Sequence, residues 1–186
     1  MTELETQLLP PVALADLSAE TTVICATLRL AQTLSRAHDE RAHKDSGWHT
    51  LKACMLGQWL NHLYDALALR GQAPAGLNSL RVLNSFQEQV LWEKVIRAQV
   101  DTTVEALFDI QALAASAAQA HKLSIEWNIP VDGGDTGSEE QRQFQRWQSA
   151  FRAHCQQHHF IDVPSLHARL IDHLSEIEQA LLPGQL

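Results

Sequence analysis

Apolar residues recur at helical spacing through most of this chain, and this pattern predicts a mainly α-helical protein. The first long stripe predicts a helix from residue 56 to about residue 70. Further stripes at 139–158 and from 162 onward predict that the second half is wholly helical. The residues of the first stripe are Leu56, Trp59, Leu60, Leu63, Tyr64 and Leu67.

Three short segments before residue 84 break this pattern and predict a small α/β layer. TTVICAT at 21–27 is apolar and β-branched, as is typical of a buried strand. TLKACM at 50–55 and LRVL at 80–83 also suit extended backbone. A helix is expected at 28–44, and the alternation of strands with helices is typical of a parallel sheet.

These segments divide the chain of 186 residues into three parts. Residues 1–19 form an N-terminal lead-in, residues 20–83 form the small α/β layer, and residues 84–186 form a helical bundle. The Gly-rich loop at 128–138 lies inside the bundle. Because parallel strands expect neighbours on both sides, the layer is incomplete alone. We therefore expect exposed edges or apolar patches, or their coverage by another copy of the chain.

Three helix starts are predicted from their capping residues. Ser85 followed by Glu88 fits a capping box. Asp101 is expected to cap a long helix that runs to about residue 123, and Asp162 to begin the last helix. The buried face of the helix that follows Ser85 is expected to contain Phe86, Val90, Leu91, Val95 and Ile96. Core or interface packing is expected for Trp59, Trp92, Trp127 and Trp147.

The net charge of -8 argues against autonomous nucleic-acid binding, because phosphate neutralisation needs a basic face. Cys25, Cys54 and Cys155 lack the CxxC spacing, so reduced thiols in a cytoplasmic protein are expected. No apolar run approaches the roughly 18 residues that span a bilayer, and the acidic N-terminus does not resemble a signal peptide. A membrane partner is therefore not expected.

The common catalytic motifs are missing from the sequence. It contains no GxxxxGK[ST], no HExxH and no GxSxG, and no acidic and lysine set typical of a metal-dependent nuclease. We therefore predict that this chain is not an enzyme and has no cofactor. Isolated helical histidines such as His121 are expected at the surface or half-buried.

The segment RAHCQQHHF at 152–160 raises the question of a metal site. His154 with His158, and Cys155 with His159, are each four residues apart and share a helix face. Zinc needs three or four ligands, and no second cluster supplies the rest. Cys155 also lies on the apolar stripe of its helix, which favours a helix end with the thiol in the core. A small metal-dependent enzyme is the weakest alternative.

Four segments in order carry a family resemblance. TTVICATLRLAQTLSRAHDE contains a strand followed by Arg29-Leu30-Ala31, and GWHTLKACMLGQWL contains Trp48 and Trp59-Leu60. RVLNSFQEQVLWEKVI and FQRWQSAFRAHCQQHHFIDVPSLHARL follow. Together they resemble a bacterial family called probable DNA repair proteins, which are similar to AddB-type subunits of helicase–nuclease complexes. The family tends to have prolines at the positions of His49, Leu51, Met55 and Ser85.

The resemblance covers about residues 20–182 and implies a UvrD-type, helicase-like first domain with a helical insertion. Family members are longer and continue into further helicase-like domains and a PD-(D/E)XK nuclease domain, so this chain would correspond to their N-terminal segment. The implied function is non-catalytic: the segment would scaffold or position DNA, or a partner subunit, in DNA repair and recombination. DNA would be bound together with the rest of the protein or a partner subunit.

Arg29, Arg36 and Lys52 are the candidate DNA contacts, because they are the basic residues closest to the strand ends. Ligands of open α/β sheets gather at strand ends. No catalytic, cofactor-binding or metal-binding residue is predicted. The alternative function is a free-standing acidic helical module that dimerises and binds protein, which the charge of -8 favours.

Overall fold

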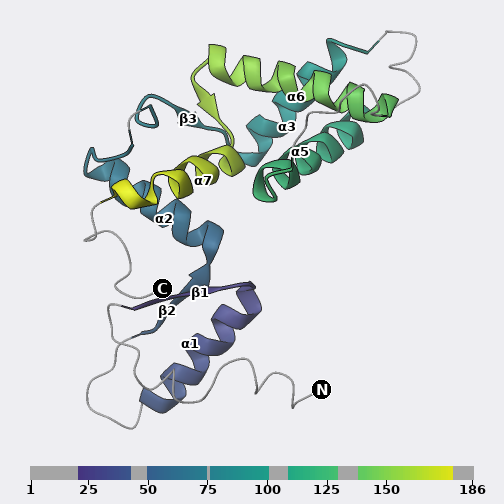
Figure 1. The fold of residues 1–186 in the computed structure, drawn as a ribbon. Helices are drawn as coiled ribbons and strands as arrows, with labels where there is room; N and C mark the ends of the chain where they lie inside the picture. Colours follow the sequence, from purple (N-terminus) through teal and green to yellow (C-terminus); the bar gives the residue numbers. More distant parts are fainter. Residues whose placement is uncertain (1–20, 43–49, 75, 101–108, 130–137, 178–186) are drawn as a thin grey trace, which may run out of the picture. The chain divides into compact units, whose positions relative to one another are not determined.

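The computed structural model confirms a mainly helical protein with small parallel sheets (Figure 1). The residues that it describes are 21–42, 50–74, 76–100, 109–129 and 138–177. The chain forms two compact units. One comprises Met1–Ala73 with Ser175–Leu186, and the other comprises Pro74–Leu174.

The first unit contains the strand–helix alternation that the sequence predicts. Its elements are β1 (Thr22–Cys25), α1 (Leu28–Ala42), β2 (Lys52–Met55) and α2 (Leu56–Leu69). The two strands pair in parallel, with Thr22 opposite Lys52 and Cys25 opposite Met55. α1 packs against both strands (Figure 1). The small core beneath it is formed by Cys25, Ala31, Leu34 and Leu51.

The turn from β1 into α1 is short, and a residue of the turn, Thr27, caps the N-terminus of α1. Only Ala26 and Thr27 separate the two elements. The Leu30 backbone N–H donates to the Thr27 hydroxyl oxygen at 3.2 Å, which satisfies one of the free donors at the start of the helix. The N-terminus of α1 therefore has a local hydrogen-bond acceptor.

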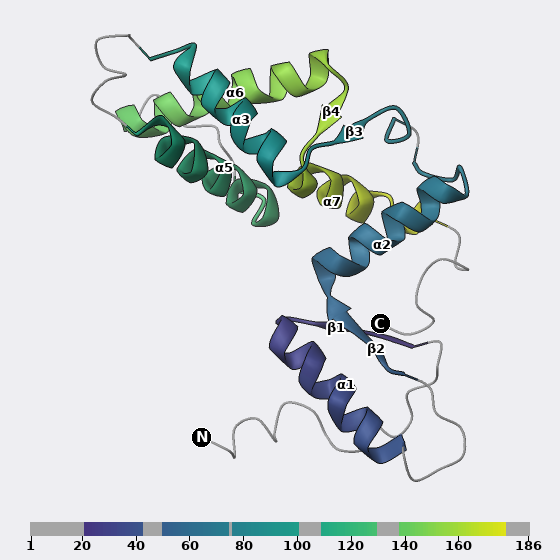
Figure 2. The ribbon, with the colours of Figure 1, turned by 180° about the vertical axis from the view of Figure 1, so that it is seen from behind.

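In the second unit, several helices separate two strands along the chain, and these two strands pair with each other. Its elements are β3 (Arg81–Val82), α3 (Ser85–Arg97), α5 (Ile110–Glu126), α6 (Glu139–Gln157), β4 (Phe160–Ile161) and α7 (Val163–Asp172). A 3-10 turn follows at Leu174–Glu176. β3 pairs in parallel with β4, although α3, α5 and α6 lie between them in the chain (Figure 2). β3, which the sequence analysis assigned to the α/β layer, thus belongs to the helical unit.

The core of this unit lies where α3 packs against α5 and α6. The rings of Trp92 and Phe151 stack at its centre, with centroids 4.2 Å apart and planes 6° apart. Cys155, one turn beyond Phe151, is also buried. The predicted apolar stripe of α6 is therefore confirmed.

One predicted helix start is wrong in position, and another falls outside the described residues. Asn84, not Ser85, caps α3: its side chain accepts the Gln87 N–H at 2.9 Å, and the Gln87 side chain accepts the Asn84 N–H at 3.1 Å. The helix that extends past residue 123 begins at Ile110, where Asp109 is the cap. Asp101 lies outside the described residues.

The last helix begins as predicted but ends earlier. Asp162 is its cap, since it accepts the Ser165 N–H at 3.0 Å, and Pro164 stands in its first turn. α7 ends at Asp172 and the chain continues into the 3-10 turn, whereas the stripe from residue 162 onward predicted one uninterrupted helix.

The buried face predicted for α3 is wrong at two residues. Phe86 is 74% exposed and Val90 is 47% exposed. At about 100° per residue, both lie on the side of the helix opposite to the centre of the buried group. That group contains Leu91, Trp92, Val95 and Ile96. α3 therefore carries a second apolar stripe. Of the two alternatives for the tryptophans, core packing is confirmed for Trp59 and Trp92 and excluded for Trp127, which is 74% exposed, so that interface packing stays a prediction for Trp127.

Candidate functional site

The three predicted DNA contacts are exposed, but the fold does not bring them together. Arg29 lies in the first turn of α1, at the carboxyl end of β1. Lys52 begins β2 and is paired with Thr22, so it lies at the amino end of the sheet. Arg36 lines a shallow hollow of about 440 Å³ that also contains Asp39 and Glu40. Their contact with DNA stays a prediction.

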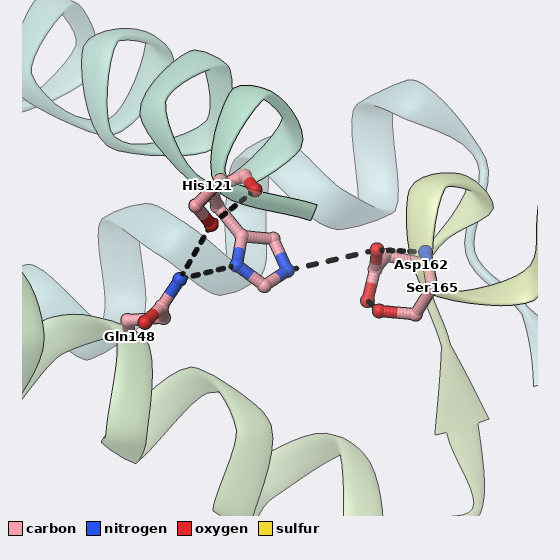
Figure 3. Close-up of polar contacts among 5 residues, drawn as sticks. His121, Gln148, Asp162 and Ser165 are labelled. Atoms are coloured by element: carbon pink, nitrogen blue, oxygen red, sulfur yellow. Dashed lines mark hydrogen bonds and ion pairs between the residues drawn. The ribbon is translucent and has the colours of Figure 1, made fainter. Parts of the chain in front are cut away.

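A buried polar network joins three helices of the second unit, and His121 lies at its centre (Figure 3). His121 on α5 is 0% exposed, so the expectation of a surface or half-buried residue was wrong. Its ring lies between the Gln148 amide from α6 and the Asp162 carboxylate at the start of α7 (Figure 3). The aromatic rings of Trp92 and Phe151 pack beside it, with centroids 5.5 Å and 5.4 Å away.

In this network the Gln148 amide nitrogen is the donor to both of its partners, and its contact with the His121 ring indicates which ring nitrogen is the acceptor. The Gln148 amide nitrogen donates to His121 Nδ1 at 3.0 Å and to the Ser124 hydroxyl at 3.1 Å. Ser124 in turn donates to the His121 carbonyl at 2.7 Å. With the amide nitrogen as donor, Nδ1 is the acceptor, which leaves Nε2 as the ring nitrogen that carries a proton. Nε2 faces Asp162 Oδ1 at 3.6 Å, which is an electrostatic contact and too long for a hydrogen bond.

Asp162 connects this network to the N-terminus of α7. Besides the Ser165 backbone N–H, its carboxylate accepts the Ser165 hydroxyl at 2.8 Å. Burial by itself raises the pKa of Asp162, but the facing His121 ring and the two Ser165 donors lower it further than burial raises it. The net pKa lies below its ordinary value, so the carboxylate is charged at neutral pH.

The pKa values of two neighbouring groups, Glu88 and Cys155, are raised, whereas that of Asp162 is lowered. Burial, followed by the charge of Asp162, raises the pKa of Glu88, although the nearby His121 and Lys122 side chains oppose this shift. The Trp92 N–H itself has no hydrogen bond of ordinary geometry within the described part of the chain. Burial raises the pKa of the Cys155 thiol to about 12, with smaller contributions from Asp162 and Glu88. A thiol in this state is protonated and is a poor nucleophile.

The chemistry of this network favours a structural role. A catalytic His–Asp pair needs a nucleophile or substrate within reach of the second ring nitrogen. Here Gln148 occupies that nitrogen, and the Ser124 hydroxyl is committed to the carbonyl of its own helix. Gln148 is 2% exposed and Asp162 is 4% exposed, so neither offers a surface to a substrate. The network therefore fixes α5, α6 and the start of α7 to one another.

The segment 152–160 is a helix end, as the sequence analysis favoured. α6 stops at Gln157, and His159 takes the left-handed conformation with φ of 55°. The rings of His154 and His158 lie 4.3 Å apart. Burial, the neighbouring His158 and Lys94 lower the pKa of His154. Among the residues with described positions, no three His, Cys, Asp or Glu side chains are grouped to hold a metal ion.

A groove lies beside the second apolar stripe of α3, and we call it the Phe86 groove. Its volume is about 280 Å³. The apolar lining consists of Leu83, Phe86, Val90, Leu91 and Phe160. Polar groups are contributed by Arg81, Gln87, Lys94 and His154. The sequence alone does not predict this surface, because the two apolar stripes of α3 together resemble one broad buried face.

No helix in the described ranges is long and apolar enough to cross a membrane. Comparisons of the chain with models of protein families, with curated proteins and with solved structures gave no match.

Proposed function

We propose that this chain is a non-catalytic segment of a DNA-repair helicase–nuclease-like protein, in which it scaffolds or positions DNA or a partner subunit. The observation that carries the proposal is the connection between β3 and β4. These two strands pair in parallel, and α3, α5 and α6 lie between them along the chain. The family resemblance implies a helical insertion within a helicase-like first domain. A helical layer that begins and ends at paired parallel strands fits such an insertion.

The turn between β1 and α1 supports a role without ATP hydrolysis. In nucleotide-binding α/β domains, a glycine-rich loop and a lysine at this position cradle the phosphates. Here the turn consists of Ala26 and Thr27, and the Thr27 hydroxyl accepts an N–H of the helix that a phosphate would otherwise use. No glycine or lysine is present in this turn.

Fluorescence anisotropy with a labelled single-stranded oligonucleotide tests the proposal. We expect binding at low salt that weakens steeply as salt rises, because each neutralised phosphate releases counterions. Arg29→Glu is expected to weaken binding more than Arg36→Glu, since Arg36 shares its hollow with Asp39 and Glu40. Arg152→Glu, at an exposed position of α6 in the other unit, is the matched charge control. Absence of binding at low salt contradicts a direct DNA role.

A second candidate function is the free-standing acidic interaction module that dimerises. The exposure of Phe86 and Val90 on one face of α3 favours it, because large apolar side chains grouped at a surface mark association sites. Sedimentation velocity over a range of concentrations tests this function. A dimer that lacks affinity for DNA would favour it over the first proposal, and a monomer at all concentrations would contradict it.

A further inference from the structure

We propose that the Phe86 groove binds an acidic amphipathic segment of a partner protein. An apolar side chain of the segment enters the groove, and its carboxylates face Arg81 and Lys94. This inference goes beyond the DNA-repair proposal and does not depend on it.

The shape of the groove suits an apolar anchor. Of its lining residues, Leu83 and Leu91 are buried, while Phe86 and Val90 are exposed. Its volume of about 280 Å³ lies below the range of most small-molecule sites. A space of this size suits one or two inserted side chains, which is how amphipathic helices bind hydrophobic grooves. Covering Phe86 and Val90 also removes apolar surface from water, which favours binding.

The charges at the groove point to an acidic partner. Arg81 and Lys94 are both exposed, and neither forms an ion pair with any residue that the structure describes. Among the residues with described positions, no acidic side chain lines the groove, although the chain as a whole has a net charge of -8. The groove is thus a local basic site on an acidic protein. Complementary charges at such a site select the partner and speed its association.

A peptide fits these observations better than a nucleic acid does. Single-stranded nucleic acid is bound by aromatic platforms and by rows of cations that follow the phosphates. Leu83, Val90 and Leu91 give this groove an aliphatic lining, and Phe86 is the one largely exposed ring in the part of the lining that the structure describes. Its lining contains two permanent cations, Arg81 and Lys94. This lining suits leucine-like side chains flanked by carboxylates.

The probe is a fluorescein-labelled designed helical peptide of about 16 residues, with leucines at positions i, i+3, i+4 and i+7 and glutamates elsewhere. Its twin carries lysine in place of every glutamate. Anisotropy titration against the full chain is expected to give a dissociation constant in the micromolar range for the acidic peptide. The lysine twin is expected to bind at least about tenfold more weakly.

Two variants separate the apolar and the charged contributions. Phe86→Ala is expected to weaken the binding of the acidic peptide by about tenfold or more, because apolar anchors dominate such interfaces. Arg81→Glu combined with Lys94→Glu is expected to reverse the preference in favour of the lysine twin. The controls are Leu69→Ala, at a position of α2 that is 89% exposed, and Arg152→Glu. Both controls are expected to leave peptide binding unchanged, and circular dichroism confirms that each variant is folded.

Three results overturn this inference. The first is equal binding of both peptides, or no binding of the acidic one. The second is Phe86-dependent binding of oligo-dT in place of the peptide. The third is a concentration-dependent dimer of the chain that Phe86→Ala dissociates while peptide affinity is absent. Loss of oligonucleotide binding in Arg29→Glu, with peptide binding intact, bears only on the DNA proposal.

Discussion

His121 Nε2 lies 3.6 Å from Asp162 Oδ1, and both side chains are buried. The same carboxylate also caps α7 through Ser165. One acidic side chain therefore satisfies the start of one helix and faces the ring proton of a histidine on another helix.

Asp162→Ala is expected to lower the free energy of unfolding by about 2–4 kcal/mol, from the lost helix cap and the unpaired buried imidazole. Urea denaturation followed by circular dichroism measures this change. Asp172→Ala, at the exposed end of α7, is the matched control and is expected to change stability by less than about 0.5 kcal/mol. Equal effects at the two positions would show that the network contributes nothing.

The effect of Asp162→Ala should also depend on pH in a defined direction. The pKa of Asp162 is lowered in the folded protein, so its stabilisation is fully present above the unfolded value of about 3.8. It is lost as pH falls through the folded pKa. The difference in stability between the two proteins is therefore expected to be constant from pH 7 to about pH 4 and to narrow as the pH falls further. Divergence there would contradict the lowered pKa.

Glu88→Gln is expected to raise the stability of the fold at neutral pH, whereas Asp162→Ala is expected to lower it. The pKa of Glu88 is raised in the folded protein, so the folded state binds its proton more tightly than the unfolded state. Stability from this group is present below the unfolded value of about 4.5 and is lost as pH rises through the folded pKa. The variant is expected to be modestly more stable than the natural protein at pH 7, with a gap that closes toward pH 4. Thermal unfolding at several pH values checks this, and a gap that widens in acid would refute it.

Cys155 is expected to resist alkylation in the folded protein. With a pKa of about 12, only about one thiol in ten thousand is ionised at pH 8, and the side chain is buried as well. Mass spectrometry after a short iodoacetamide pulse should find Cys54, which is half-buried, modified before Cys155. In denaturant all three cysteines should react at similar rates. Rapid native labelling of Cys155 would contradict its position in the core.

Two phenylalanines of the helical unit should differ sharply in their effect on folding. Phe151→Ala removes a fully buried ring and is expected to cost about 3–5 kcal/mol. Phe86→Ala removes a largely exposed ring and is expected to change stability by less than about 0.5 kcal/mol. Parallel urea titrations provide the comparison. A large loss in Phe86→Ala would mean that this ring belongs to the core and not to a binding surface.

Local sequence signals predicted most elements of this fold. β-branched residues indicated β1, apolar spacing indicated α2 and α6, and Asp162 with Pro164 indicated the start of α7. The cap of α3 was misplaced by one residue because Asn84 with Gln87 and Ser85 with Glu88 both satisfy the capping pattern. Local signals of this kind identify a helix more reliably than its first residue.

The sites were harder to predict, because they depend on contacts between distant segments. His121 looked like an isolated histidine, yet it continues the buried row of Ala114 and Ala117, and Gln148 interrupts the apolar stripe of α6. Both irregularities can be seen in the sequence, but the sequence does not show that Gln148 of α6 contacts His121 of α5. The second stripe of α3 was also visible as an angular offset of Phe86 and Val90 from the buried group.

The pairing of β3 with β4 has a consequence for the order in which the chain folds. Its hydrogen bonds include Arg81 N–H to the His159 carbonyl and Leu83 N–H to the Ile161 carbonyl, each 2.8 Å long. So short a ladder cannot by itself offset the entropy of closing the long loop between the strands, which includes the described helices α3, α5 and α6. We therefore expect the strands to pair only after those helices have packed. Hydrogen exchange at the Arg81 and Leu83 amides should accordingly become protected late in refolding, when the helical unit is complete.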